Sequence, residues 1–108
     1  MKYQVLFRIE KKELIDKLFT KIMNLQEYFQ DSGHILDIEV VFSGDVVTHF
    51  KAERGRFYRT DLDIVLCHNA LQKEGMSDIF DRNIRTVRAG IAEIVEKKAQ
   101  GYIEITIE

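Results

Sequence analysis

The stretch Leu62-Asp63-Ile64-Val65-Leu66-Cys67 decides the fold of this chain of 108 residues. Apolar and β-branched residues fill almost every position, which is typical of a strand buried on both faces. Asn69 and Gln72 follow at the spacing of an N-cap and an N3 residue, and they predict a capping box that starts a short helix. Gly75 is expected to end this helix. A buried strand that leads directly into a helix indicates a parallel α/β sheet.

Apolar runs and helical patterns also alternate before and after this stretch. A helix is predicted from Lys12, with one apolar face and a C-terminal Gly33. The residues of that face step by four and three positions: Leu14, Leu18, Ile22, Leu25 and Phe29. A short helix should follow residues 43–45 and bury Val46, Val47 and Phe50. The last predicted helix, residues 90–99, is amphipathic through Ile91, Ile94 and Val95, and Gly101 follows it.

Further strands are predicted at residues 3–9, 38–42, 84–87 and 102–107. About five alternations of strand and helix indicate a mainly parallel sheet with helices on both faces, in one domain spanning residues 1–108. Ligands of such sheets bind beyond the carboxyl ends of the strands. Three loops are therefore expected to share that edge: Ser43-Gly44-Asp45, Cys67-His68-Asn69 and Arg88-Ala89-Gly90.

Composition sets the broad class of the protein. The chain is 45% hydrophobic and 31% charged, which is ordinary for a globular domain, and its net charge of −2 argues against a dedicated nucleic-acid binder. A single cysteine cannot form an internal disulfide. The first residues lack the apolar core of a signal peptide, and the longest apolar run, residues 64–67, is far too short to span a membrane. The expected location is the cytoplasm.

Cys67 is the one candidate for covalent chemistry. It ends a strand just before a predicted helix, and the N-terminus of a helix favours a thiolate. The alternative interpretation is structural, because free cysteines are among the most buried residues in proteins. Position in the sequence leaves both interpretations open.

Other chemistries are disfavoured by the residues around Cys67. A Cys-x₅-Arg anion loop would need an arginine at position 73, where Lys73 stands. His68 is a poor base for Cys67, since neighbours at a strand end point apart, and the three histidines lack the spacing of zinc ligands. Residues 43–45 hold one glycine, short of a nucleotide-binding loop. The basic, aromatic segment 51–59 is interpreted as a solvated loop rather than a nucleic-acid site. Two interpretations of Arg82, Arg85 and Arg88 stay open: they line the path of an anionic partner, or they are solvent-facing positions of an edge strand.

The sequence from the second strand onward resembles the DsrE-like family, whose fold is also called YchN-like. The resemblance rests on Cys-x-Asn-x-Leu at residues 67–71, Gly-Met-Ser at 75–77, Gly-Ile-Ala-Glu at 90–93 and Gly-Tyr at 101–102. It implies a three-layer α/β/α domain that assembles as a homotrimer or hexamer. Phe50, Phe57, Tyr58 and Phe80 are expected to provide some of the subunit contacts.

The resemblance also implies a role in sulfur relay. Cys67 would then carry sulfane sulfur as a persulfide between donor and acceptor proteins, without a metal or organic cofactor, and Asn69 would cap the helix behind it. The alternative is a noncatalytic oligomeric module that binds a small ligand or protein partner at the same edge. The residues expected at that edge are Ser43, Gly44, His68, Asn69, Arg88 and Gly90.

Overall fold

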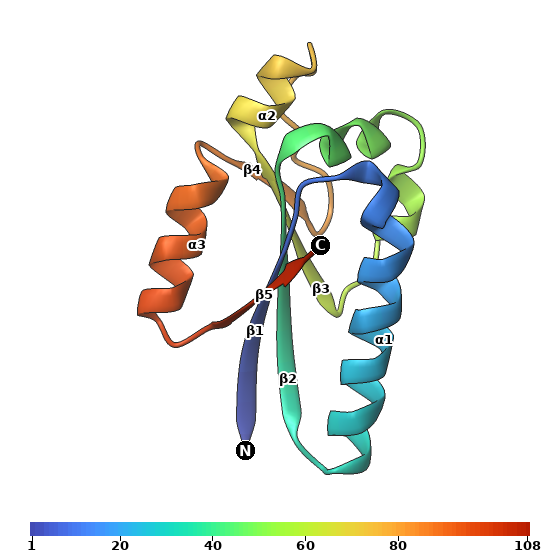
Figure 1. The fold of residues 1–108 in the computed structure, drawn as a ribbon, viewed down its shortest axis with the longest axis vertical. Coiled ribbons are helices and arrows are strands. Elements are labelled where there is room, and N and C mark those ends of the chain that lie inside the picture. Colours follow the sequence, from blue (N-terminus) through green and yellow to red (C-terminus); the bar gives the residue numbers. More distant parts are fainter.

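Five parallel strands form one sheet in the computed structural model, which describes residues 1–108 (Figure 1). The strands are β1 (Lys2–Ile9), β2 (Ile35–Phe42), β3 (Leu62–Cys67), β4 (Ile84–Val87) and β5 (Ile103–Ile107). Their order across the sheet is β4-β3-β2-β1-β5. The predicted parallel pairing of β2 with β3 is confirmed, with Ile38 opposite Leu62 and Phe42 opposite Leu66.

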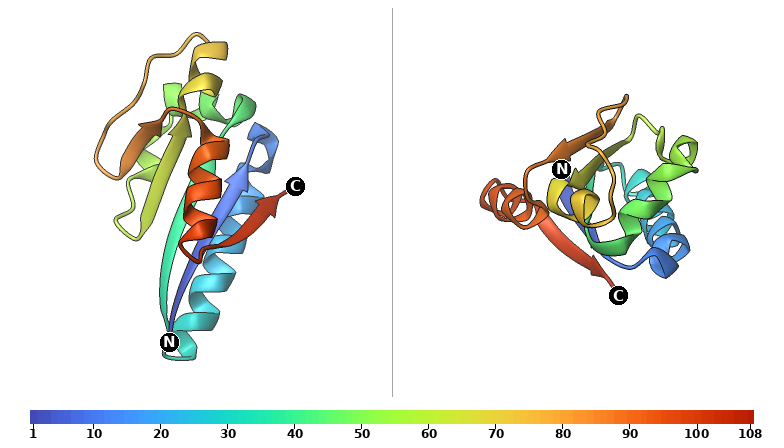
Figure 2. Two further views of the ribbon diagram at one scale, coloured as in Figure 1. Left: turned by 90° about the vertical axis from the view of Figure 1, so that its left-hand side faces the viewer. Right: turned by 90° about the horizontal axis from the view of Figure 1, so that it is seen from above.

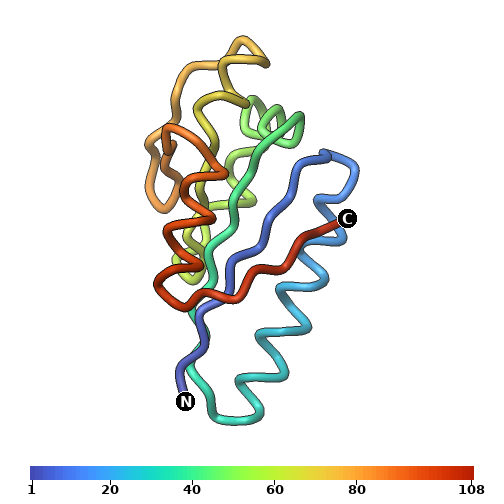
Figure 3. The backbone as a smooth tube through the Cα atoms, turned by 60° about the vertical axis from the view of Figure 1, so that its left-hand side comes forward, coloured from blue at the N-terminus to red at the C-terminus, as the bar shows by residue number.

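Helices cover both faces of the sheet, which gives the expected three layers (Figures 1 and 2). One face carries α1 (Ile15–Asp31), which follows a short 3₁₀ turn, η1 (Lys12–Leu14). Two further 3₁₀ helices, η2 (Gly44–Lys51) and η3 (Arg54–Phe57), and the short helix α2 (His68–Lys73) complete the connections between β2 and β4. The opposite face carries α3 (Gly90–Ala99), after which the chain crosses to β5 at the far side of β1 (Figure 3).

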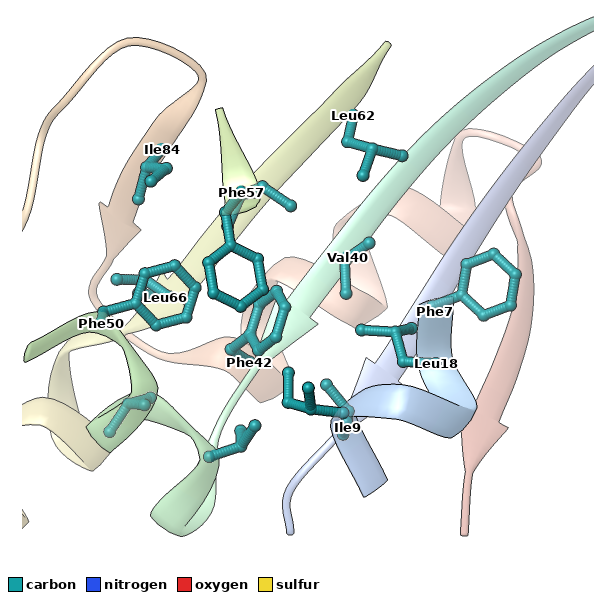
Figure 4. Packing of buried hydrophobic residues seen from close by; sticks show 14 of the residues in the cluster. Phe7, Ile9, Leu18, Val40, Phe42, Phe50, Phe57, Leu62, Leu66 and Ile84 are labelled. Atoms are coloured by element: carbon teal, nitrogen blue, oxygen red, sulfur yellow. The ribbon is translucent and has the colours of Figure 1, made fainter. Parts of the chain in front are cut away.

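The main hydrophobic core lies mostly between the sheet and α1. Alternate residues of each strand enter it, as Phe7 does from β1 and Phe42 from β2, and the predicted face of α1 contributes the buried Leu18 and Ile22 (Figure 4). Phe50 and Phe57 close this core at the ends of the strands, where their rings stack 4.3 Å apart between centroids. A second cluster of four buried residues lies under α3: Leu6, Val41, Val65 and Ile94.

Two of the predicted helix ends are confirmed in detail. Gly33 has a φ of +72°, and the N–H of His34 donates to the carbonyl of Phe29 at 3.0 Å. Gly75 has a φ of +67°, and the N–H of Met76 donates to the carbonyl of Leu71 at 2.9 Å. Both are glycines in the left-handed conformation that commonly closes a helix.

The predicted capping box at Asn69 is wrong. Helix α2 begins at His68, its N-cap is Cys67, and no side chain caps it. The backbone of Cys67 is still extended (φ −83°, ψ 121°), so β3 passes into the helix without an intervening loop. Asn69 therefore lies inside the first turn, and Gln72 donates to the carbonyl of Met76 instead (3.4 Å).

The predicted apolar face of the last helix is also wrong in part. Only Ile94 is buried, whereas Ile91 and Val95 are 60% and 63% exposed. The sheet beneath α3 carries charged residues, so α3 turns Glu93 and Lys97 toward it rather than a full apolar face. Two expected subunit contacts, Phe50 and Phe57, are fully buried within the chain and cannot serve as contacts.

None of the helices has both the length and the apolar character needed to cross a bilayer.

Candidate functional site

Cys67 lies at the carboxyl edge of the sheet, where β3 and β4 end side by side. Its register partner is Val87, the last residue of β4. By the alternation of side chains along the strand, Cys67 shares the orientation of Val65 toward the face covered by α3, although it also packs into the main core cluster. Gly90, the first residue of α3, packs directly against it. The thiol residue is only 7% exposed.

Gly90 is needed at this contact. A Cβ on Gly90 would lie 3.3 Å from the Cβ of Cys67 and 3.2 Å from Cγ1 of Val41, both tighter than ordinary van der Waals contact. The start of α3 therefore approaches β2 and β3 as closely as a backbone without a side chain allows. Cys67 is enclosed between the start of its own helix and the start of α3.

A cavity of about 800 Å³ opens beside Cys67. Its lining includes Val87 and Ala89, the neighbours of Cys67 and Gly90, but not these two residues themselves. The cavity forms where the connections from β3 and β4 separate, because α2 packs with η2 on one side of the sheet and α3 covers the other (Figure 2). Such a separation of neighbouring connections is the usual binding crevice of a parallel α/β sheet.

The predicted edge residues divide into two groups. His68, Asn69 and Arg88 line the cavity, and Gly90 lies behind it with Cys67. Ser43 and Gly44 lie at the same carboxyl edge of the sheet but outside this cavity, where the loop after β2 meets the end of β1. The N–H of Ser43 donates to the carbonyl of Ile9 (3.1 Å).

Gly44 has a structural reason to be glycine. Its φ is +70°, and a Cβ there would lie 2.6 Å from the carbonyl oxygen of Glu10. The loop that follows β1 and the loop that follows β2 are therefore in contact at Gly44, outside the cavity.

His68 has a partner that the sequence did not reveal. Its Nδ1 lies 2.6 Å from Oδ1 of Asp78, and both side chains are more than one-third exposed in the wall of the cavity. Asp78 lies in the irregular segment between α2 and β4, ten residues after His68. No periodic pattern marks a loop residue of this kind, so spacing alone could not have found it.

Arg88 is a charged residue of the site that has no partner within the chain. It is exposed, lines the cavity, and makes no hydrogen bond or ion pair within the chain. The other two arginines of the predicted set are engaged: Arg82 stacks on Tyr58, with 4.2 Å from Cζ to the ring centroid, and Arg85 is held by carboxylates. Glu96 and Asp78 also line the cavity, which therefore presents both signs of charge.

The second feature missed by the sequence analysis is a layer of charges between the sheet and α3, here called the ionic layer: Glu39, Asp63, Arg85, Glu93 and Lys97. Arg85 of β4 is its centre, with contacts of 3.0 Å to Asp63 and 2.9 Å to Glu93. Glu39 of β2 is 1% exposed and lies 3.7 Å from both Arg85 and Lys97. Glu39 was not singled out from the sequence, because its partners come from another strand and from α3.

The ionic layer holds three carboxyl groups and only two basic groups, so one bound proton would make it neutral. The shifts in pKa of Glu39 and Glu93 place this proton on Glu39. Burial, a hydrogen bond with Glu93 and the nearby negative charges raise the pKa of Glu39 to about 8, although Lys97 opposes them. Burial also acts to raise the pKa of Glu93, but its hydrogen bonds with Glu39 and Arg85 outweigh this and lower it. With both groups ionised, neither oxygen of Glu39 would have a hydrogen-bond partner. A proton on Glu39 would let one of its two oxygens donate to the carboxylate of Glu93, while the other oxygen would still lack a partner.

The basic segment 51–59 is tied to the rest of the chain by ion pairs. Arg54 contacts Asp81 (3.2 Å), and Arg59 contacts Asp61 (2.6 Å). Arg56 lies over the ring of Phe19 and pairs with an aspartate of α1. Each of the three arginines thus has an acidic partner within the chain.

The fold and the edge cavity define a three-layer α/β domain with a parallel five-stranded sheet and a crevice at the ends of β3 and β4. Among solved structures, the chain is similar to MTH1491, a protein of unknown function from Methanobacterium thermoautotrophicum. The two share 21% sequence identity with a TM-score of 0.78, over 96% of this chain and 98% of that chain. This likeness shows a common fold. No family model and no curated protein matches the chain.

Proposed function

We propose that the chain is a sulfur-relay protein that carries sulfane sulfur as a persulfide on Cys67. The observation that carries the proposal is the position of Cys67, which lies between the first residues of α2 and α3 and directly behind the largest cavity of the domain. The resemblance of residues 62–102 to DsrE-like sequences supports the same role. The cytoplasm, where thiols stay reduced, is the compartment that suits such a carrier.

The transfer chemistry needs only one thiol. The thiolate of Cys67 attacks the terminal sulfur of a donor persulfide, R–S–SH. A bond forms between Sγ and that sulfur, the S–S bond of the donor breaks, and the donor leaves as the thiolate R–S⁻. An acceptor thiol later removes the sulfur by the same exchange. Electrons balance within each exchange, so no metal or organic cofactor takes part.

The burial of Cys67 fits a carrier that must protect its cargo. A persulfide on an exposed side chain would be reduced by any thiol in solution, whereas one enclosed by α3 meets only molecules that enter the cavity. The unpaired guanidinium of Arg88 is suited to hold the carboxylate of an entering donor or acceptor. The donors and acceptors of sulfur are then selected by whether they can enter the cavity and reach Cys67.

The second candidate is a noncatalytic module that binds a small ligand in the same cavity. It is favoured by two polar side chains that line the cavity without partners in the chain, Arg88 and Asn69. In this case Cys67 is a buried strand residue, and its 7% exposure reflects packing alone. Arg88 then supplies most of the affinity for a carboxylate or phosphate group.

Intact-mass spectrometry separates the two candidates. After incubation with a cysteine desulfurase and cysteine, the carrier gains one sulfur per chain, and a reductant removes it. The Cys67→Ser variant gains none, because no other cysteine is present. Arg88→Met serves as the matched variant. If Arg88 binds the carboxylate of the donor, this variant should gain sulfur more slowly but should still gain one sulfur per chain. A wild-type mass that never changes supports the module.

A homo-oligomer, trimeric or hexameric, is part of the proposal. Its support within the chain is the pair Ile91 and Val95, which lie four residues apart on α3 and leave a strip of apolar surface open beside the cavity. Phe80, 71% exposed, adds to the apolar surface of the chain. Light scattering at micromolar concentration should give a multiple of the chain mass, and the Val95→Glu variant should reduce it.

A further inference from the structure

The pairing of His68 with Asp78 has the geometry of a base and the group that orients it. Nδ1 of His68 lies 2.6 Å from Oδ1 of Asp78, and its other ring nitrogen, Nε2, makes no hydrogen bond within the chain. The carboxylate accepts from Nδ1–H, so the proton-accepting lone pair of the neutral ring is on Nε2. Both residues line the cavity beside Cys67. In many enzymes, this arrangement of a carboxylate, an imidazole and an open site prepares the imidazole to take a proton from a bound reactant.

We propose that His68, oriented by Asp78, is the general base that deprotonates the acceptor thiol when the sulfur leaves Cys67. This inference rests on the proposed function, because it assigns a residue to the second half of the relay. The acceptor class is a small thiol that carries a carboxylate, with the thiol at His68 and the carboxylate at Arg88. From the sequence, His68 was judged only as a base for its neighbour Cys67, for which it is poorly placed, and was not considered as a base for an acceptor thiol.

The proton and electron pairs can be followed through the step. Nε2 of His68 takes the proton from the acceptor R–SH, and the thiolate R–S⁻ attacks the terminal sulfur of the Cys67 persulfide. A bond forms between R–S and that sulfur, the bond to Sγ breaks, and Cys67 leaves as a thiolate. The protonated imidazole then returns its proton to the thiolate or to water in the open cavity. No oxidant or reductant is needed beyond the persulfide itself.

The expected size of the effect follows from the ionisation of a thiol. A free thiol with a pKa of about 8.5 is only about 3% ionised at pH 7, so a base that removes this restriction can accelerate attack by up to roughly thirtyfold. The same base contributes little at pH 9.5, where the thiol ionises without help. A residue that only shaped the cavity would give the same loss at both pH values.

The experiment measures release of sulfur from preloaded chain to L-cysteine, followed by intact mass at pH 7 and pH 9.5. The His68→Gln variant should lose about tenfold to thirtyfold in rate at pH 7 and less than about threefold at pH 9.5. Asp78→Asn should show a smaller loss with the same dependence on pH. His49→Gln is the matched control, because His49 lies in η2 and contacts the carbonyl of Lys12 rather than the cavity.

Equal losses at both pH values, or no loss in His68→Gln, would overturn the assignment. Cysteamine, which lacks the carboxylate, should react more slowly than L-cysteine with wild type and equally with Arg88→Met. If the wild type never gains a sulfur, the carrier proposal itself has failed. The dyad is then judged from the imidazole ¹⁵N resonances of His68: a shift of Nε2 on addition of L-cysteine supports a thiol at this nitrogen, and an unresponsive ring contradicts it.

Discussion

The two faces of the sheet differ in the side chains that pack on them. Most of a main cluster of 22 buried residues packs on the face under α1, and this cluster includes four fully buried phenylalanines. The face under α3 has an apolar cluster of only four residues, and below it lies the ionic layer. Gly90 and the cavity lie at the α3 end of this second face, and Cys67, itself a member of the main cluster, packs against Gly90 there. The comparison teaches that one face stabilises the domain, while the other holds the groups that can titrate or react.

The largest expected effect comes from the α1 face. Phe57→Ala removes a ring that stacks on Phe50 and meets Phe42 edge to face, and it should lower the free energy of unfolding by about 3–5 kcal/mol. Val95→Ala on the α3 side removes an exposed group and should change it by less than about 0.5 kcal/mol in the monomer. Urea denaturation measures both. Equal losses in the two variants would remove the distinction between the faces.

The next effect tests the close approach of α3 to Cys67. Gly90→Ala adds a methyl group 3.2 Å from Val41 and 3.3 Å from Cys67, so it should cost about 1–3 kcal/mol of stability. Gly55→Ala is the control, because nothing lies within 4 Å of the added methyl group and its backbone is not in the left-handed region. Thermal unfolding of the two variants should differ clearly. A Gly90→Ala variant as stable as the control would mean that the start of α3 is loosely packed.

A smaller effect should come from the proton held in the ionic layer. The pKa of Glu39 is about 8 in the folded chain and near 4.5 when unfolded, so the folded state favours the protonated form. Its contribution to stability is fully present below about pH 4.5 and is lost as the pH rises to about 8. The fall between pH 6 and pH 9 should be about 2–3 kcal/mol.

Glu39→Gln is the matched variant for this prediction. Its amide keeps a hydrogen-bond donor toward Glu93 and cannot ionise, so its stability should be nearly flat where that of the wild type falls. The lowered pKa of Glu93 acts in the opposite direction but at lower pH, where its own titration lies. Denaturant titrations at pH 6, 7, 8 and 9 give the comparison. A wild type that is as stable at pH 9 as at pH 6 would show that Glu39 is not the proton carrier.

How far the sequence predicts the molecule also differs between the two faces. The positions of the five strands, the burial of Leu18 and Ile22 and the turn at Gly33 all follow from periodicity and glycine, because apolar packing repeats with the geometry of the element. On the α3 face the same reasoning wrongly predicted that Ile91 and Val95 are buried. Their place is taken by Glu93 and Lys97, whose partners come from strands distant in the sequence.

The candidate site was predicted in its strands but not in its contacts. The carboxyl ends of parallel strands lie at one edge of the sheet, so His68, Asn69 and Arg88 could be placed at that edge, whereas only the structure shows that β3 and β4 are neighbours. Asp78 lies in an irregular segment and meets His68 only through the path of that loop. The capping role given to Asn69 was wrong because β3 enters α2 without a loop, and no composition pattern reports where a strand becomes a helix.

Alkylation of Cys67 in the native protein is the most direct test of whether its sulfur is reached through the cavity. The anionic reagent iodoacetate should modify the wild type far faster than the chain globally unfolds, as measured by exchange of its slowest amides. The rate should fall in Arg88→Glu, which repels the anionic reagent. Modification of wild type only at the rate of global unfolding would contradict the account, because Cys67 would then be an inert part of the core.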